Sequence, residues 1–355
     1  NTKKRILRNY GRKFSLIYYN KPMPQISVIM SVYKEPLDWM AQSIDSILNQ
    51  IYSDFEFLIV DDNPTDDKLI YFLNDYQKKD SRIKIIVNEQ NVGLTKSLNI
   101  AIKQAQGKYI ARMDADDISC KNRFQVQYDY MEQHLEVDVC GSWAYKIGEM
   151  SLLDERKIIL PTCNDDIRLG FLFSSQIIHP SVFVRSEVIK MYYYNETVIK
   201  AQDYDLWASL IIAGRKICNI PKCLLYYRVT RKSQKIEYTN LQQDTANNSR
   251  GRLLDFFLPN ENKWNKRLHN NICTGKIDSA AEAKGWLEFL HDYLSSTYPQ
   301  SEIFLKNTFN KIWFNVCQTT NNDFSFYRSS VLYSFSIIIY LRFIKNKLIS
   351  ISRNI

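Results

Sequence analysis

The sequence predicts an α/β protein built on a mostly parallel sheet. Apolar runs begin near residues 26, 55, 83 and 109, and each is followed by a stretch with helical spacing of its apolar residues. Nearly continuous apolar runs are typical of parallel strands buried on both faces. Their regular alternation with helical stretches indicates repeated βα units. After about residue 230 the alternation is lost, and helical segments with scattered aromatic residues follow.

The expected elements can be placed along the chain from these patterns. We expect strands at 25–33, 55–60, 83–87, 109–113, 137–144, 177–185, 217–220 and 224–228. We expect helices at 37–50, 68–79, 94–104, 124–135 and 164–172, from 188 onward, and from about 201 to 211. A domain boundary is expected at 230–240. The predicted organisation is a basic leader at 1–23, a sheet domain at 24–232 and a mainly helical region at 233–355.

Polar side chains follow four consecutive strands at the point where each strand ends. These residues are Ser31, Tyr33, Glu35, Asp61, Asp62, Asn88, Asn91, Asp114, Asp116 and Asp117. In parallel α/β sheets, ligands bind beyond the carboxyl ends of the strands. The sequence therefore predicts a binding site at this edge of the sheet.

Three carboxylates, Asp114, Asp116 and Asp117, lie within four residues directly after a buried strand. Repelling charges at the end of a core strand are costly unless a cation lies among them. Mg²⁺ and Mn²⁺ use one or two carboxylates and share their other positions with phosphate and water. The alternative is an acidic turn that stays in water. No Gly-x-Gly-x-x-Gly or Gly-Lys-Ser/Thr phosphate loop is present, so a nucleotide would be held by side chains and a metal.

The net charge of +9 and the pI of about 9.0 suit an anionic partner. The first 21 residues contain seven basic and no acidic side chains, interleaved with apolar ones. The apolar run at 331–341 is followed by Arg342, Lys345, Lys347 and Arg353. Both ends resemble interfacial segments that lie on anionic lipid, although solvated basic tails are the alternative. No stretch is long enough to cross a bilayer. The seven cysteines include no Cys-x-x-Cys pair, which favours reduced thiols in the cytoplasm.

Six segments, in order over about residues 24–230, resemble family 2 inverting glycosyltransferases of the GT-A fold. The segments are 26–35, the acidic run 60–66, 88–94, the Asp-x-Asp segment 111–117, the His-Pro-Ser-Val at 179–182 and the Gln-Asp-Tyr-Asp-Leu-Trp at 202–207, followed by Ile220-Pro and Tyr226-Tyr-Arg228. The last 120 or so residues are outside this resemblance.

The resemblance implies a role for each candidate residue. Ser31, Tyr33 and Glu35 would line the nucleotide pocket, and Asp61 or Asp62 would accept from a uracil NH. Arg112 would help to hold the base or the phosphates. Asp114 would face the ribose and the metal, and Asp116 would bind the Mn²⁺ or Mg²⁺ ion that neutralises the leaving diphosphate.

The general base implied by the resemblance is Asp203, which would take the proton of the acceptor hydroxyl. The other explanation for acids at this helix start is the helix dipole, and Asp205 fits that explanation better. Position 202 is Gln where many relatives have Glu. Position 230 is Thr where many have His. His179 would lie near donor or acceptor, or be a hydrogen-bonded core histidine.

The expected activity is transfer of a hexose (galactose, glucose or N-acetylglucosamine) from a UDP-sugar with formation of a β-linkage. The expected acceptor is a lipid-linked saccharide such as N-acetylglucosamine on undecaprenyl diphosphate, in O-antigen, capsule or lipopolysaccharide synthesis. Gln-x-x-Arg-Trp, the mark of processive synthases, is absent. The expected location is the cytoplasmic face of the bacterial inner membrane, bound peripherally to its anionic surface. Two alternatives are a nucleotidyltransferase that makes the activated sugar and a basic nucleic-acid-binding protein; our interpretation predicts no nucleic-acid partner.

Overall fold

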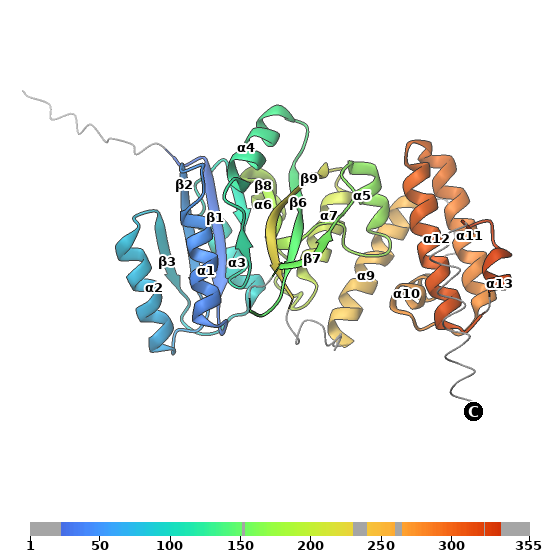
Figure 1. Ribbon diagram of the computed structural model, residues 1–355, viewed down its shortest axis with the longest axis horizontal. Coiled ribbons are helices and arrows are strands. Elements are labelled where there is room, and N and C mark those ends of the chain that lie inside the picture. Colours follow the sequence, from blue (N-terminus) through green and yellow to red (C-terminus); the bar gives the residue numbers. More distant parts are fainter. Residues whose placement is uncertain (1–22, 151–152, 230–239, 260–264, 323, 335–355) are drawn as a thin grey trace, which may run out of the picture.

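Four parallel strands form the N-terminal half of the sheet in a computed structural model that describes residues 23–150, 153–229, 240–259, 265–322 and 324–334 (Figure 1). The order is β3-β2-β1-β4, with every neighbouring pair parallel. The elements are β1 (Ile26–Val32), α1 (Leu37–Leu48), β2 (Phe55–Asp61), α2 (Asp67–Lys79), β3 (Ile83–Val87), α3 (Leu94–Gln104) and β4 (Tyr109–Arg112). The predicted α/β class is confirmed.

The second half of the sheet is mixed. Beyond β4 the order is β8-β6-β9-β5, with β7 on the side of β6. Only the β6–β9 pair is parallel there. The elements are β5 (Ile118–Ser119), α4 (Arg123–Gln133), β6 (Val139–Ile147), β7 (Leu153–Ile158), α5 (Asn164–Gly170), the 3₁₀ turn η1 (His179–Ser181), β8 (Phe183–Arg185), α6 (Ser186–Tyr192), α7 (Gln202–Ile212) and β9 (Ile217–Arg228).

Two strand predictions differ from the structure. The expected strand at 177–185 is strand only at its end, because Pro180 lacks an amide N–H and the Ser181 hydroxyl donates to the Ile178 carbonyl 2.7 Å away, which favours the turn η1. The expected pair at 217–220 and 224–228 is one strand, β9, whose register against β6 shifts around Pro221. A bulge accommodates a proline that cannot donate to the ladder. The short strands β5 and β7 were not predicted.

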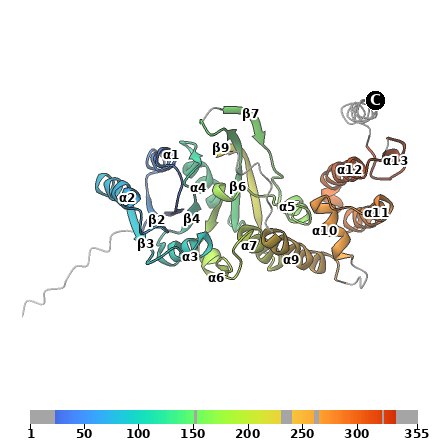
Figure 2. The same ribbon diagram turned by 90° about the horizontal axis from the view of Figure 1, so that it is seen from below.

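The sheet is covered by helices on both faces, which separates two apolar cores. Alternate residues of β1 (Ile26, Val28, Met30) pack with α1, α2 and α4, whereas Ile29 packs with α3, α6 and α7. Figure 2 shows the two helical layers on opposite sides of the sheet. This two-sided burial explains why the strands are apolar throughout and carry polar residues only at their ends.

A helical region follows the sheet, as predicted. It contains α9 (Asn240–Phe257), α10 (Lys266–Thr274), α11 (Ala280–Thr297), the 3₁₀ turn η2 (Pro299–Ser301), α12 (Glu302–Thr319) and α13 (Phe324–Arg328). One apolar core runs from the sheet through α9 to α12. The buried His269 joins the two parts: its Nε2–H donates to the Leu172 carbonyl (2.7 Å), while its Nδ1 accepts from the indole of Trp286 (3.1 Å).

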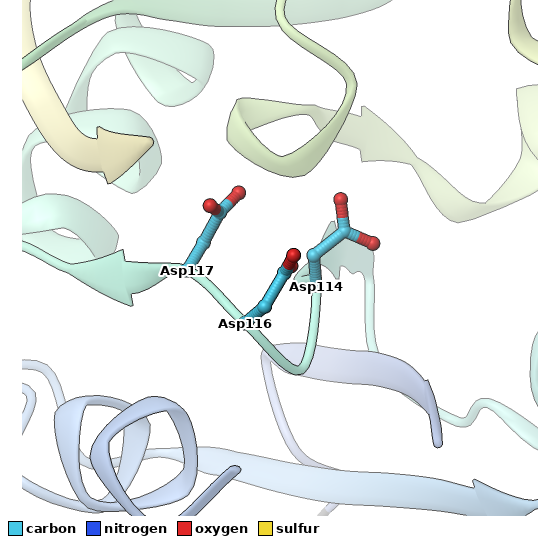
Figure 3. A group of neighbouring side chains, drawn as sticks. All are labelled: Asp114, Asp116 and Asp117. Carbon is cyan, nitrogen blue, oxygen red and sulfur yellow. The ribbon is translucent and has the colours of Figure 1, made fainter. Parts of the chain in front are cut away.

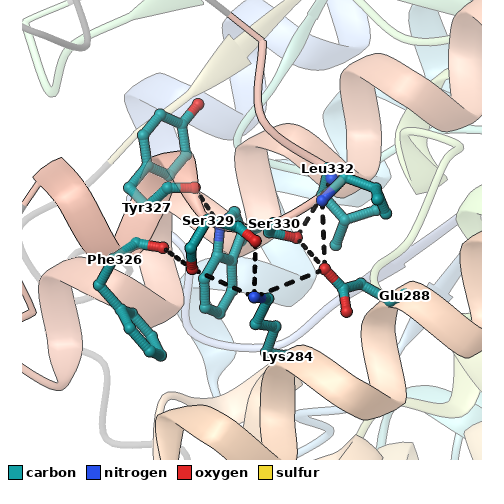
Figure 4. A network of polar contacts seen from close by, with 9 residues as sticks. Lys284, Glu288, Phe326, Tyr327, Ser329, Ser330 and Leu332 are labelled. Atoms are coloured by element: carbon teal, nitrogen blue, oxygen red, sulfur yellow. Dashed lines mark hydrogen bonds and ion pairs between the residues drawn. The ribbon is translucent and has the colours of Figure 1, made fainter.

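The segment after α13 folds back onto α11 (Figure 4). The ammonium group of Lys284 donates to the Ser329 carbonyl (2.7 Å), and the hydroxyl of Ser330 donates to the Glu288 carboxylate (2.7 Å). The Val331 amide donates to the same carboxylate (3.2 Å). These contacts fix the last described part of the chain.

The basic N-terminal leader at 1–22, Thr230 and the basic C-terminal segment at 335–355 lie outside the described residues. Among the helices that are described, none combines the length and the apolar character that crossing a bilayer requires.

Gly107 allows the closest main-chain approach in the parallel half. A Cβ at this position would lie 2.5 Å from the Ser27 amide nitrogen, which is main chain and cannot rotate away. We expect Gly107→Ala to lower the free energy of unfolding by about 2 kcal/mol, the usual cost of overpacking. Urea unfolding followed by circular dichroism measures it.

Gly285 is the matched control, because it lies within α11 and a Cβ there meets nothing within 4 Å. Gly285→Ala should raise the free energy of unfolding by roughly 0.5–1 kcal/mol, since alanine favours the helix. Equal effects of the two substitutions would contradict the packing argument.

Candidate active site

The carboxyl ends of β1, β2 and β4 meet at one edge of the sheet. Val32 is paired with Asp61 and Ile29 with Arg112, and the Met113 amide donates to the Ile29 carbonyl (3.0 Å). Ser31, Tyr33 and Glu35 follow along β1 and the loop after it. The structure thus brings the predicted residues of these three strands together, as the parallel order requires.

The three carboxylates of the acidic turn after β4 lie close together (Figure 3). One carboxylate oxygen from each of Asp114, Asp116 and Asp117 lies within 4.8 Å of the others. The turn is held by its main chain: the hydroxyl of Ser43 on α1 donates to the Asp114 carbonyl (2.7 Å), and Arg228 Nε donates to the Asp116 carbonyl (2.6 Å). This leaves the side chains of Asp114 and Asp116 partly exposed and facing the same space.

Burial and the repulsion between neighbouring carboxylates raise the pKa values of Asp116, Asp117 and Glu35. The pKa of Asp116 rises to about 6, first because it is desolvated and then because Asp114 and Glu35 lie nearby. Burial also raises the pKa of Asp117, and Asp114 and Asp116 add to this. The pKa of Glu35 is raised by burial in spite of the Tyr33 amide, which donates to its carboxylate (2.8 Å). Such a group is stabilised by a cation.

The donor set fits a divalent metal ion. Carboxylate oxygens are the ligands that Mg²⁺ and Mn²⁺ prefer. Asp117 uses one oxygen to accept from the Arg228 amide (2.7 Å), and its other, buried oxygen has no hydrogen-bond partner in the described part of the chain. The acidic turn therefore offers three neighbouring carboxylates to a divalent ion.

Arg112 lies between the acidic turn and the rest of the site. Both of its terminal nitrogens contact the Asp114 carboxylate, and its side chain is only 4% exposed. A two-fold arginine–carboxylate contact is strong and directional. Arg112 therefore fixes Asp114 and supplies one buried positive charge to the site.

Asp203 lies in the first turn of α7, within electrostatic reach of Arg112 and Asp114. Its pKa is raised, chiefly by burial, with a small addition from Asp114 that Arg112 opposes. The preceding Ala201 has a left-handed backbone with φ of 55°, an uncommon conformation for a residue with a Cβ. A partly buried carboxylate of raised pKa on a strained turn is the type of group that serves as a general base.

Asp205 lies two residues further along, and its carboxylate is engaged in contacts with another helix. Its carboxylate accepts from the Ser249 hydroxyl (3.1 Å) and pairs with Arg252 (3.5 Å), both on α9. The two aspartates of α7 therefore have different environments.

The carboxylates of Asp61 and Asp62 also differ in the number of hydrogen bonds that they accept. Asp62 accepts from the side-chain amides of Asn88 (2.8 Å) and Asn91 (3.0 Å) and from the amides of Val92 (2.8 Å) and Gly93 (2.9 Å). Asp61 accepts from the Asn63 amide (2.9 Å), and its second oxygen is buried without a partner among the described residues. Burial raises the pKa of Asp61. Asp62 thus holds the 88–93 loop, whereas Asp61, which is fully buried, keeps one oxygen without a donor among the described residues.

Two aromatic neighbours of the site were not among the predicted site residues. Tyr194 is buried, lies near Arg112 and Asp203, and has its hydroxyl 2.6 Å from Nε2 of His179. Burial lowers the pKa of His179, so the histidine is neutral. Tyr227 lies beside Asp117, Asp114 and Asp116, and burial raises its pKa. No local pattern marks Tyr194, whereas Tyr227 was part of the quoted Tyr-Tyr-Arg.

Comparison with known proteins gives the family. The model of glycosyl transferase family 2 matches residues 27–192. An uncharacterized glycosyltransferase of Methanocaldococcus jannaschii is 38% identical over 257 residues, which cover 72% of this chain and 85% of that protein. The O-antigen biosynthesis glycosyltransferase WbnJ of Escherichia coli is 34% identical over 215 residues, covering 59% and 82%. The amylovoran biosynthesis glycosyltransferase AmsE of Erwinia amylovora is 29% identical over 203 residues, covering 57% and 75%.

The fold is also found in a solved structure. TarS residues 1–349 of S. aureus, crystallised in complex with UDP-GlcNAc, superimposes with a TM-score of 0.54 at 16% identity, over 84% of this chain and 93% of that one. This likeness concerns the fold. With the family match and the relatives, it confirms the predicted GT-A architecture, and the chain belongs to glycosyl transferase family 2 and is a glycosyltransferase.

Proposed function

We propose that the chain is a metal-dependent, inverting hexosyltransferase that moves galactose, glucose or N-acetylglucosamine from a UDP-sugar to a lipid-linked saccharide. The observation that carries the proposal is the placement of the partly buried Asp203 within electrostatic reach of Arg112 and of Asp114 in the acidic turn. A base and an anion-binding centre then flank one space. Direct displacement at a sugar carbon needs both.

The nucleotide would lie over the ends of β1 and β2. The unpartnered Asp61 oxygen suits the NH of a uracil, because a buried carboxylate is stabilised by such a donor. Ser31, Tyr33 and Glu35 would line this pocket, and Arg112 would contact the base or the phosphates. A UDP-sugar donor is consistent with the similar fold of S. aureus TarS, which was crystallised with UDP-GlcNAc.

The metal would be Mn²⁺ or Mg²⁺ held by Asp114 and Asp116. When bound, it acts as a Lewis acid that offsets the charge of the leaving diphosphate. The residues of the chain contribute by orientation: Arg112 fixes Asp114, and the Arg228 and Ser43 contacts hold the main chain of the turn.

Asp203 would take the proton of the acceptor hydroxyl. The oxygen so freed forms a bond to the anomeric carbon from the face opposite the diphosphate. The bond from that carbon to the diphosphate oxygen breaks, and UDP leaves with the electron pair. One bond forms and one breaks at the same carbon, so its configuration inverts and an α-linked donor gives a β-linkage.

The acceptor would be a saccharide on a lipid diphosphate, such as N-acetylglucosamine on undecaprenyl diphosphate. Two relatives are named for O-antigen and amylovoran biosynthesis. The basic ends of the sequence suit an anionic membrane surface, which would place the enzyme peripherally at the cytoplasmic face of the bacterial inner membrane. Membership of a glycosyltransferase family argues against the nucleotidyltransferase and nucleic-acid-binding alternatives.

Release of UDP tests the proposal. We expect purified protein to release UDP from one of a panel of UDP-hexoses when Mn²⁺ and a synthetic lipid-diphosphate N-acetylglucosamine are present, and EDTA to abolish it. Asp203→Asn should lower kcat by roughly 10²–10⁴-fold, because the base is lost.

Asp67→Asn is the matched control, since Asp67 lies in the first turn of α2 and is exposed. If helix-dipole compensation were the role of Asp203, the two variants would be equally active. Full activity of Asp203→Asn would overturn the assignment.

The pH dependence follows from the raised pKa of Asp203. A base works only when it is deprotonated, so activity should fall as the pH drops through this raised pKa. The acid limb of kcat should therefore lie above the usual aspartate value of about 4. Residual activity of Asp203→Asn, followed over the same range, should lack that limb. An unchanged limb would assign it to another group.

Substitution of Asp62 should lower the stability of the protein, whereas substitution of Asp61 should weaken its binding of UDP. Asp62→Ala leaves four donors of the 88–93 loop without their acceptor, and it should cost about 3 kcal/mol of unfolding free energy. Asp61→Ala should change that free energy by less than about 1 kcal/mol, because it also removes a desolvated charge. Calorimetry should show UDP binding at least about tenfold weaker for Asp61→Ala, the effect of losing one charged hydrogen bond. Unaltered UDP affinity would exclude Asp61 from the nucleotide site.

A further inference from the structure

The helix that carries Asp203 is attached on its far side to the helical region. α9 packs along α7, and both lie beneath the sheet in the view of Figure 2. α9 buries Leu253, Leu254 and Phe257 in the core that it shares with α7. The contact between α9 and α7 is thus mainly apolar. It also has a polar part near the N-terminal end of α7, where Asp203 lies.

The polar part is centred on Asp205 and Arg252. The Arg252 guanidinium pairs with the Asp205 carboxylate (3.5 Å) and donates to the Asp205 carbonyl (3.2 Å) and to the Ser209 hydroxyl (3.0 Å). Ser249, which is fully buried, donates to the same carboxylate (3.1 Å). Two residues of α9 therefore hold one aspartate of α7.

Asp205 in turn closes the turn that contains Asp203. Its amide donates to the carbonyl of Ala201 (3.1 Å), the first main-chain bond of α7. Ala201 has a left-handed backbone, which is unfavourable for a residue with a Cβ. A strained residue keeps its conformation only when its surroundings fix it. The turn from 201 to 205 is thus strained at one end and fastened to α9 at the other.

We propose that α9 braces the turn that carries Asp203, and that Arg252 is a positioning residue for this base. The inference rests on the proposed role of Asp203. Arg252 contacts Asp205 and Ser209 of α7, and it acts through Asp205. The brace gives the helical region, which follows the six resembling segments, a part in the reaction: aligning the base with the acceptor hydroxyl.

Arg252→Ala tests the proposal, with Lys266→Ala as its matched control. Lys266 of α10 forms an ion pair with Asp255 of α9 (2.7 Å) that does not involve α7, and the charge change is the same. We expect Arg252→Ala to lower kcat at least about tenfold, because a misplaced catalytic group reacts slowly. The KM for the UDP-sugar and the affinity for UDP should stay unchanged, since the nucleotide lies over the ends of β1 and β2. Lys266→Ala should match the wild type.

Two further variants separate positioning from general stability. Arg252→Lys keeps a charge near Asp205 and should restore part of kcat. Ser249→Ala removes the second donor to Asp205 and should lower kcat in the same direction, which provides a test even if Arg252→Ala does not fold. The acid limb of the kcat–pH profile should shift in Arg252→Ala, since the environment of Asp203 changes, and stay in place in Lys266→Ala.

The outcomes distinguish the two proposals. If Asp203→Asn is inactive while Arg252→Ala and Ser249→Ala both match Lys266→Ala, the brace is refuted and the role of Asp203 stands. If Asp203→Asn keeps full activity, the proposed base is wrong and the brace falls with it. An equal loss of UDP affinity and kcat in Arg252→Ala would indicate general disruption and would also overturn the inference.

Discussion

The constraint on which the site depends is the repulsion among the carboxylates after β4. Asp114, Asp116 and Asp117 share a small space with Glu35, and burial makes their charges more costly. The fold keeps them there by fastening the turn from both sides, through Ser43 of α1 and Arg228 at the end of β9. Arg228 also stacks on Trp39 of α1, 4.7 Å from the ring centre, so the two fastening elements support each other.

Arg112 lowers the electrostatic free energy of these neighbouring carboxylates. Its guanidinium lies against Asp114 and is shielded from water, so the pair interacts more strongly than it would at the surface. One acid of the turn is therefore paired with an arginine of the chain itself, while one buried oxygen of Asp117 has no hydrogen-bond partner among the described residues. The remaining repulsion between the carboxylates is what makes a divalent ion favourable. The same arginine is within electrostatic reach of Asp203, so its charge acts both on the acidic turn and on the proposed general base.

The sequence was most informative where the signal was local. The four βα units were predictable because continuous apolar strands and helical spacing repeat at short range, and in a parallel sheet this alone brings the strand ends together. The strand predicted at 177–185 was wrong over most of its length because the proline and serine of η1 form local contacts that a hydrophobic run does not reveal. The different hydrogen bonding of Asp61 and Asp62 could not be predicted from the sequence either, since it depends on the position of the loop at 88–93. Tyr194 reaches His179 across 15 residues, and no spacing rule indicates that contact.

The two aspartates of α7 show why the helical region matters for the proposed chemistry. Both lie in the first turn, where the helix dipole favours negative charge, so the dipole cannot distinguish them. The surroundings do: Asp203 is within electrostatic reach of Arg112 and Asp114, whereas Asp205 contacts Ser249 and Arg252 of α9. One turn of helix thus carries the proposed base and a second carboxylate that attaches the helix to α9. Because Asp205 is separated from Asp203 by only one residue, a displacement of α9 would move the proposed base as well. The helical region is for this reason better regarded as part of the active-site framework than as an appendage to the sheet.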